Sequence, residues 1–129
     1  MAAPVVYGDV ILDHYLHPRH VGSFDPDDTQ VGTALVGTPQ LGQVLKLQIR
    51  LQDNQIQAVC FRAFGCGAVI AAGSLATEWL QGRGLDQALA IDSQDFVRAL
   101  ALPPAKLHCA LLAQDAIQAA VADYTRKHS

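Results

Sequence analysis

Cys66 stands between two glycines, in the segment Phe64-Gly65-Cys66-Gly67, where a thiol could act as a nucleophile or as a metal ligand. The residues before it favour a strand and those after it a helix, so we expect Cys66 at a helix N-terminus. The partial positive charge and free N–H groups of such a terminus favour a thiolate over a thiol. The alternative is a small buried hydrophobic side chain, because free cysteines are often buried.

His108 and Cys109 form a second candidate group, close to the start of the last predicted helix. Imidazole and thiolate are ordinary ligands of zinc and of iron–sulfur clusters. Neighbouring side chains on a helix point about 100° apart, but in a less regular first turn both could reach one metal ion. The alternative is a solvent-facing histidine beside a buried cysteine. Together with Cys66, the pair indicates a metal site formed by Cys66, His108 and Cys109.

Cys60 and three histidines fit such a site less well. Cys60 lies inside a predicted strand, roughly 20 Å from Cys66 along that strand, so we interpret it as a packing or edge thiol. His14, His17 and His20 are interrupted by a proline and lack a thiol or carboxylate motif, which favours ordinary surface or loop histidines. We find no Gly-rich phosphate loop, nucleophile elbow or paired carboxylates, so the sequence does not indicate an enzyme.

The first half of the chain predicts one helix followed by three strands. Apolar residues at helical spacing predict a helix over residues 6–17, ended by Pro18, and an irregular loop over residues 19–33. Strands are expected at residues 33–37, 44–51 and 56–64, with a turn at residues 53–54, which makes an antiparallel meander. In the third strand, the alternation places Ile56, Ala58 and Cys60 on one side of the sheet.

The second half is predicted to be helical, with a helix from Ala68 that stops before Gly82 and one or two short helices over residues 85–100. Asp92 or Ser93 could cap the second short helix. Residues 106–124 predict a final helix with one apolar stripe, made of Ala110, Ala113, Ile117, Ala120 and Tyr124. The expected fold is α+β, a three-stranded antiparallel meander packed against helices in a two-layer single domain over residues 1–129.

Composition narrows the class of protein further. The 129 residues are 50% hydrophobic, enough to fold as one domain without disulfides. A net charge of −3 argues against nucleic-acid partners, and no apolar run reaches the roughly 18 residues of a membrane span. The odd count of three cysteines favours a reducing compartment, so we expect a cytoplasmic location.

These features together resemble the U-type iron–sulfur cluster assembly scaffolds, the IscU/NifU N-terminal type, over roughly residues 7–127. The resemblance is carried by short motifs along nearly the whole chain. They are His14-Tyr15, Pro18-Arg19, Val21-Gly22-Ser23-Phe24-Asp25, Val36-Gly37, Phe64-Gly65-Cys66-Gly67, Thr77-Glu78-Trp79, Leu102-Pro103-Pro104-Ala105-Lys106, His108-Cys109 and Asp115-Ala116-Ile117.

The resemblance implies a protein that receives iron, and sulfur from a cysteine desulfurase, and builds a 2Fe–2S cluster. An Hsp70-type chaperone with its J-protein co-chaperone then takes part in passing the cluster on. In that family three cysteines, an aspartate and a histidine surround the metal. Cys66 and Cys109 match the second and third cysteines and His108 the histidine, while Leu102-Pro103-Pro104-Ala105-Lys106 matches the chaperone-recognition motif with Ala105 in place of valine.

Cys109 also matches the family's sulfur acceptor. A helix start and the positive charge of Lys106 nearby should both lower the pKa of its thiol. We therefore expect Cys109 to be the most readily persulfidated of the three thiols.

The family pattern is broken in the loop after the first strand. Leu41 stands where the resemblance places the first cysteine, and Gln43 where it places the aspartate. Leucine cannot ligate a metal, and glutamine lacks the carboxylate charge. We therefore expect a scaffold homologue with an altered or impaired site that binds iron, a 2Fe–2S cluster or Zn²⁺. An outside thiol or a second subunit of a homodimer could complete the cluster.

Two other functions remain open at this point. One is a non-assembling regulatory or interaction protein that binds the desulfurase or the chaperone. The other is a zinc protein that uses Cys66, His108, Cys109 and a water molecule.

Overall fold

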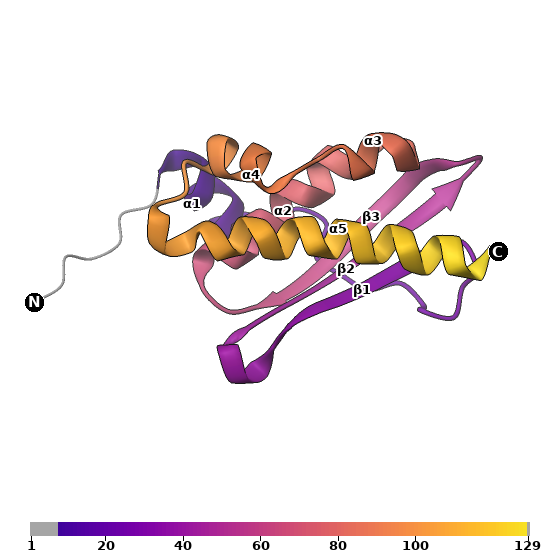
Figure 1. Cartoon of the computed structure of the whole chain (residues 1–129), viewed down its shortest axis with the longest axis horizontal. Coiled ribbons are helices and arrows are strands. Elements are labelled where there is room, and N and C mark those ends of the chain that lie inside the picture. The colour runs from indigo at the N-terminus through magenta and orange to yellow at the C-terminus, as the bar shows by residue number, and fades with distance from the viewer. Residues whose placement is uncertain (1–7, 129) are drawn as a thin grey trace, which may run out of the picture.

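The computed structural model describes residues 8–128, in which a three-stranded antiparallel sheet forms one layer and helices form the other (Figure 1). The strands follow the order β1-β2-β3. This confirms the predicted two-layer α+β fold, although residues 6–7 of the first expected helix lie outside the described part. The elements are α1 (Asp9–Leu16), β1 (Val31–Thr38), η1 (Pro39–Leu41), β2 (Gln43–Gln52), β3 (Gln55–Phe64), α2 (Gly67–Leu80), α3 (Leu85–Leu89), α4 (Ser93–Leu100), η2 (Pro104–Lys106) and α5 (Leu107–Lys127), where η marks a 3₁₀ turn.

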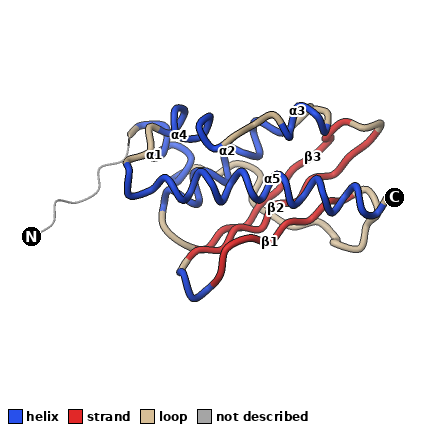
Figure 2. The backbone as a smooth tube through the Cα atoms, viewed as in Figure 1, coloured by secondary structure: helices blue, strands red, loops and turns tan. Residues whose placement is uncertain are grey.

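The sheet is built from two tight connections between neighbouring strands (Figure 2). β2 and β3 are joined by Asp53 and Asn54, which both adopt positive φ, at 54° and 63°. Two residues in this left-handed conformation match the twist of a hairpin. The 3₁₀ turn η1 joins β1 to β2 at the opposite end of β2 (Figure 1), and its last residue, Leu41, lines a hollow together with His108 of α5.

One strand departs from the alternation that its sequence shows. Ile56 of β3 pairs with Leu51, but Ala58 pairs with the residue just before Leu51, so Gln57 is an extra residue in a bulge. A bulge reverses which side of the sheet the following residues face. Ile56 therefore lies in the core, and the prediction that it shares a side with Ala58 and Cys60 is wrong.

The long helix α5 packs along the inner face of the sheet. Its predicted stripe is buried throughout, and it approaches β1 so closely that a Cβ atom on Gly32 would lie 2.2 Å from the carbonyl oxygen of Ala120. α2 lies against β3 in the same way, with the ring of Phe61 where a side chain on Gly73 would stand. Asp92 caps α4 by accepting a hydrogen bond from the Gln94 N–H at 2.6 Å. No helix in the described residues combines the length and apolar character that a membrane crossing requires.

The outer face of the sheet is partly covered by the loop between α1 and β1. Gly22 donates its N–H to the carbonyl oxygen of Phe61, and Phe61 donates to that of His20, both at 3.1 Å. Cys60 is buried under this loop, and its thiol donates to Gln48 Oε1 at 3.7 Å. The interpretation of Cys60 as a packing thiol is confirmed.

His14 is buried between α1 and α2. It lies three residues after the buried Ile11, on the face of α1 that contacts α2, and its Nδ1 is 2.7 Å from Ser74 Oγ. Burial lowers the pKa of this imidazole from its ordinary value. The prediction of a surface histidine is therefore wrong for His14, whereas His17 and His20 are exposed.

Candidate functional site

Cys66 follows Gly65, a glycine at the end of β3 that no other residue could easily replace. Gly65 adopts φ +146°, and a Cβ atom on it would lie 3.1 Å from the carbonyl oxygen of Gly42. Because only glycine tolerates both conditions, the chain can turn sharply from β3 into α2 beside the start of β2. Cys66 then becomes the N-cap residue of α2, where it is half-buried.

The two thiols of this end of the molecule lie in contact. Cys66 Sγ is 3.9 Å from Cys109 Sγ, although 43 positions separate the residues in the chain. Cys109 is the third residue of α5 and is buried, and His108 Nε2 lies 3.6 Å from its sulfur. The structure therefore brings Cys66, His108 and Cys109 together, while Cys60 lies on the outer face of the sheet under its loop.

Gln43 is also part of this site. Its side-chain amide lies 2.7 Å from His108 Nε2, and its Oε1 accepts a hydrogen bond from Cys109 Sγ at 3.8 Å. The amide nitrogen of Gln43 can donate to His108 Nε2, so the glutamine side chain connects the imidazole to the Cys109 sulfur. The sequence marks position 43 only as a lost carboxylate, and no local signal indicates this contact with a histidine 65 positions away.

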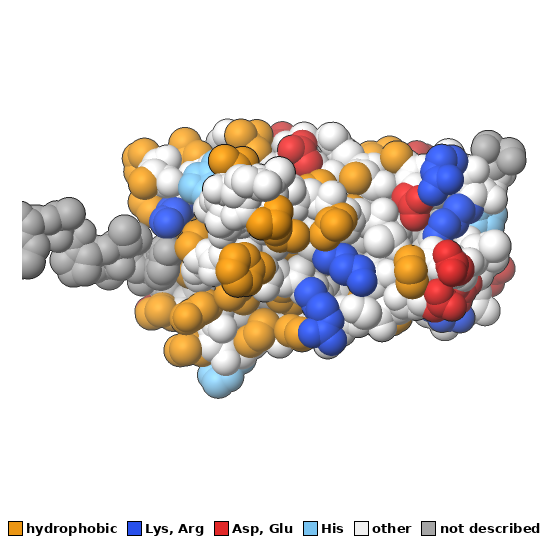
Figure 3. All heavy atoms as spheres, turned by 90° about the horizontal axis from the view of Figure 1, so that it is seen from below, with side chains coloured by type: hydrophobic (Ala, Val, Ile, Leu, Met, Phe, Trp, Pro, Cys, Tyr) orange, Lys and Arg blue, Asp and Glu red, His pale blue; other side chains and the backbone are white. Residues whose placement is uncertain are grey.

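Leu41 stands at the rim of the site with its side chain in solvent. It ends the turn η1, is 78% exposed, and lines a small hollow together with Gly37, Gln43, His108 and Leu112. Phe64, at the end of β3, is 69% exposed. Seen from below, hydrophobic side chains gather toward the end of the molecule away from the C-terminus (Figure 3).

The two thiols differ in how readily they ionise. Burial raises the pKa of Cys66, but the N–H groups of Val69 and Ala68, the Cys109 thiol and the Lys106 charge outweigh burial and lower it overall. Burial and the neighbouring Cys66 raise the pKa of Cys109 to about 12, against the smaller opposing effect of Lys106. The prediction of a lowered pKa for Cys109 is wrong, because packing at the start of α5 buries its sulfur.

The donor set fits a metal only in part. Across residues 8–128, no group of three or more His, Cys, Asp or Glu side chains is arranged to hold a metal ion. Two thiols and an imidazole adjoin one another, but the imidazole is engaged by Gln43, and Leu41 supplies no ligand atom. The expected site of Cys66, His108 and Cys109 is therefore not preformed, and metal binding by these residues stays a prediction.

Residues 102–106 lead into the site from α4. Leu102 is buried and anchors the segment, whereas Pro104 and Ala105 in the turn η2 are exposed. Lys106 is close enough to the thiols for its charge to act on both. The segment thus presents exposed residues beside the thiol pair, and its role as a chaperone-recognition motif stays a prediction.

Known proteins share both the sequence and the fold of this chain. The family model of the NifU-like N terminal domain matches residues 6–129. The iron-sulfur cluster assembly scaffold protein IscU of Escherichia coli (strain K12) is 49% identical over 124 residues, which cover 95% of this chain and 97% of that protein. The iron-sulfur cluster assembly protein 1 of Oryza sativa subsp. japonica is 48% identical over 134 residues, covering 98% and 78%. A crystal structure of a nitrogen-fixing NifU-like protein (N-terminal) from Brucella abortus superimposes with a TM-score of 0.69 at 15% identity, over 93% of this chain and 94% of that one.

Proposed function

This chain belongs to the NifU-like N-terminal domain family, and we propose that it is a scaffold on which an iron–sulfur cluster is assembled. The relatives at 48–49% identity are named for iron–sulfur cluster assembly, and the E. coli relative is named as a scaffold rather than a catalyst. The observation that carries the proposal is the contact between Cys66 Sγ and Cys109 Sγ at 3.9 Å. Thiolates are the usual protein ligands of iron–sulfur clusters, so this pair supplies two adjacent ligands.

The two thiols take different parts in receiving the cargo. Cys66, with its lowered pKa, is the thiol that first offers a thiolate to iron. Cys109 becomes a ligand when bound iron displaces its proton, because a metal competes with protons for the thiolate. His108 adds its imidazole once the ring leaves Gln43. The cargo in this proposal is iron or a 2Fe–2S cluster, held for transfer.

The family resemblance makes Cys109 the sulfur acceptor, whereas the ionisation of the two thiols favours Cys66. The acceptor thiolate must attack the outer sulfur of the desulfurase's cysteine persulfide, which releases the desulfurase cysteine as a thiolate. The thiolate form of the acceptor is more abundant at a lower pKa. We therefore propose that sulfur first enters at Cys66 and that Cys109, in contact with it, is the second position.

Leu41 leaves the cluster open on one side. Its exposed position beside His108 is where an outside thiol, or a second subunit in a homodimer, would complete the ligand set. A cluster held by two thiolates and one imidazole of the chain is bound more weakly than one held by four protein ligands.

The partners proposed from this family are a cysteine desulfurase, an Hsp70-type chaperone and a J-protein co-chaperone. The exposed side chains of Leu41 and Phe64 form an apolar surface near Cys66 and Cys109 to which a desulfurase could bind. Pro104 and Ala105 are accessible to a chaperone. We propose a cytoplasmic site of action.

A regulatory protein that assembles no cluster is the second candidate. It is favoured by the same missing ligand at Leu41 and by the lack, in the described residues, of a ready three-ligand group. Zinc binding is the third, with Cys66, His108, Cys109 and water as the ligand set. For zinc, affinity should rise with pH through the thiol range, and should fall sharply when both cysteines are replaced by alanine.

Cluster transfer separates these functions. The chain is incubated anaerobically with a cysteine desulfurase, cysteine and ferrous iron, and an apo-ferredoxin is then added as acceptor. A scaffold gains the visible absorption of a 2Fe–2S cluster and loses it to the ferredoxin. A regulator gains no such absorption but changes the rate at which the desulfurase turns over cysteine.

A further inference from the structure

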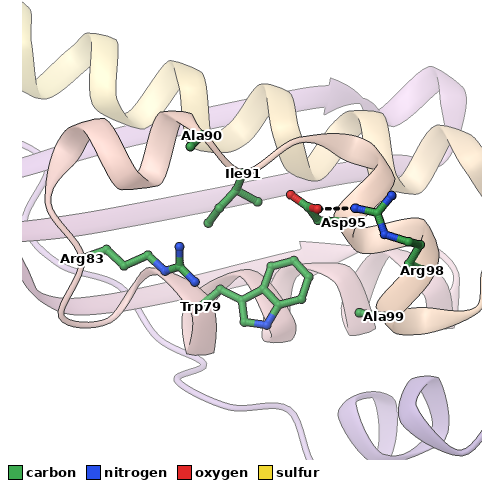
Figure 4. A pocket seen from close by; sticks show the side chains of 7 residues that line it. All are labelled: Trp79, Arg83, Ala90, Ile91, Asp95, Arg98 and Ala99. Carbon is green, nitrogen blue, oxygen red and sulfur yellow. Dashed lines mark hydrogen bonds and ion pairs between the residues drawn. The ribbon is translucent and has the colours of Figure 1, made fainter.

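A hollow of about 520 Å³ lies between the end of α2, one side of α4 and the chain that joins α3 to α4 (Figure 4). Trp79, which lines it, is 13 positions along α2 from Cys66, or roughly 20 Å at 1.5 Å per residue. The volume is in the range of small-molecule sites. Nothing in the proposed scaffold chemistry uses this hollow.

The hollow contains a fixed aromatic surface. The indole of Trp79 packs against the buried ring of Phe96, with 4.8 Å between ring centroids and 39° between planes. Ile91 is buried beside it, and Trp79 itself is only half-buried. Because Phe96 already fixes the indole, a planar ligand can stack on its exposed surface with little further loss of side-chain conformational entropy.

Charged side chains flank the indole on both sides. Figure 4 shows Arg83 extending toward Trp79 from one side and the pair formed by Asp95 and Arg98 on the other. Arg98 is tied to Asp95 at 2.6 Å. Arg83 is half-buried, and among residues 8–128 it has no ion-pair partner. Two arginines and one aspartate make the hollow positive within a chain whose net charge is −3.

We propose that this hollow binds a small molecule that carries a planar ring and an anionic group. The ring stacks on Trp79, and the carboxylate or phosphate pairs with Arg83, whose planar guanidinium matches either group in two-point contact. Arg98 adds a second positive charge across the hollow. A neutral ring leaves Arg83 without its counter-ion, and a bare anion leaves the indole uncovered, so both features belong to the ligand.

Trp79 makes the proposal directly measurable, because it is the only tryptophan of the chain. The full chain is titrated with AMP and with 3-phenylpropionate, and tryptophan emission is followed. Adenosine supplies a ring without charge, and inorganic phosphate a charge without a ring. A saturable change with one or both ring-bearing anions, at least tenfold tighter than with adenosine or phosphate, supports the proposal. The stronger of the two anions identifies phosphate or carboxylate as the recognised group.

Matched arginine variants test which side chain holds the anion. Arg83→Gln is expected to weaken binding at least tenfold, and Arg98→Gln to weaken it as well, because Asp95 then stands uncompensated in the hollow. Arg62→Gln, on the outer face of the sheet where Arg62 contacts Ser23, is expected to bind as the wild type does. Thermal melting followed by circular dichroism establishes that each variant is folded.

Two results would overturn the proposal. One is that neither AMP nor 3-phenylpropionate causes a saturable change in tryptophan emission. The other is unchanged affinity in both Arg83→Gln and Arg98→Gln. Neither result bears on cluster assembly, because the thiol pair lies at the other end of α2.

Discussion

Replacing Leu41 by cysteine and Gln43 by aspartate should let the chain hold a cluster more firmly. Position 41 ends the turn beside the thiol pair, and position 43 already contacts His108 and the Cys109 sulfur. The double change adds a third thiolate and a carboxylate where the chain now offers an alkyl group and a neutral amide. Thiolate is a far better iron ligand than either.

The cost of this change to folding is small. Leu41 is 78% exposed, and substitutions at such positions alter the free energy of unfolding by about 0.5 kcal/mol or less. Gln43→Asp gives up the amide contact with His108, worth about 0.5–1.5 kcal/mol. The sum, about 2 kcal/mol at most, is small beside the roughly 5–15 kcal/mol that stabilise a typical domain. The double variant should therefore fold.

The assay compares visible absorption after anaerobic reconstitution and the rate at which a chelator then removes iron. Mutating a residue that only hydrogen-bonds to a metal ligand changes metal affinity by about 10–100-fold. A new cysteine that binds the iron directly should therefore slow iron loss by about tenfold or more. Leu89→Cys on α3 is the matched control, since it adds a thiol at an exposed leucine remote from the site. Equal yields and equal rates of iron loss in the wild type and the double variant would refute the reasoning.

Three further predictions concern reactivity and stability. Iodoacetamide near neutral pH should label Cys66 first and Cys109 slowly, as mapped by mass spectrometry, because the pKa of Cys66 is lowered and that of Cys109 is raised to about 12; equal rates at the two thiols would contradict this. Burial lowers the pKa of His14 in the folded chain below its ordinary 6.5, so the unfolded chain binds this proton more readily. The free energy of unfolding should therefore fall as pH drops below about 6.5. Denaturant titrations of His14→Asn should show a weaker dependence on pH. Gly32→Ala should lower the free energy of unfolding by about 3 kcal/mol through its clash with α5, whereas Gly22→Ala, with its nearest atom at 4.0 Å, should melt close to the wild type.

The spacing of hydrophobic residues along the sequence was enough to predict the strands and helices that have one buried face. The alternating leucines of β2 and the apolar stripe of α5 each repeat over many residues, and the structure buries both. The bulge at Gln57 could not be predicted, because one unpaired residue leaves no mark on the local pattern. The register of β3 is set by its pairing with β2, so it depends on two segments of the chain and cannot be predicted from the sequence of β3 alone.

The site shows the same division between local and distant causes. The glycines around Cys66 predicted a thiol at a helix start, which is a local property. The pKa of Cys109 depends on burial by the rest of the fold, and His14 is buried against α2, where its hydrogen-bond partner Ser74 is 60 positions away. The contact of Gln43 with His108 likewise appears only once β2 and α5 are packed.

Iron and acid-labile sulfide bound per chain, counted after anaerobic reconstitution with a desulfurase, test the central claim most directly. The wild type and Cys60→Ser should retain both elements after desalting, while Cys66→Ala/Cys109→Ala should retain neither. Equal amounts of iron and sulfide on the wild type and on the double alanine variant would contradict the assignment of this thiol pair as the place where the cluster is built.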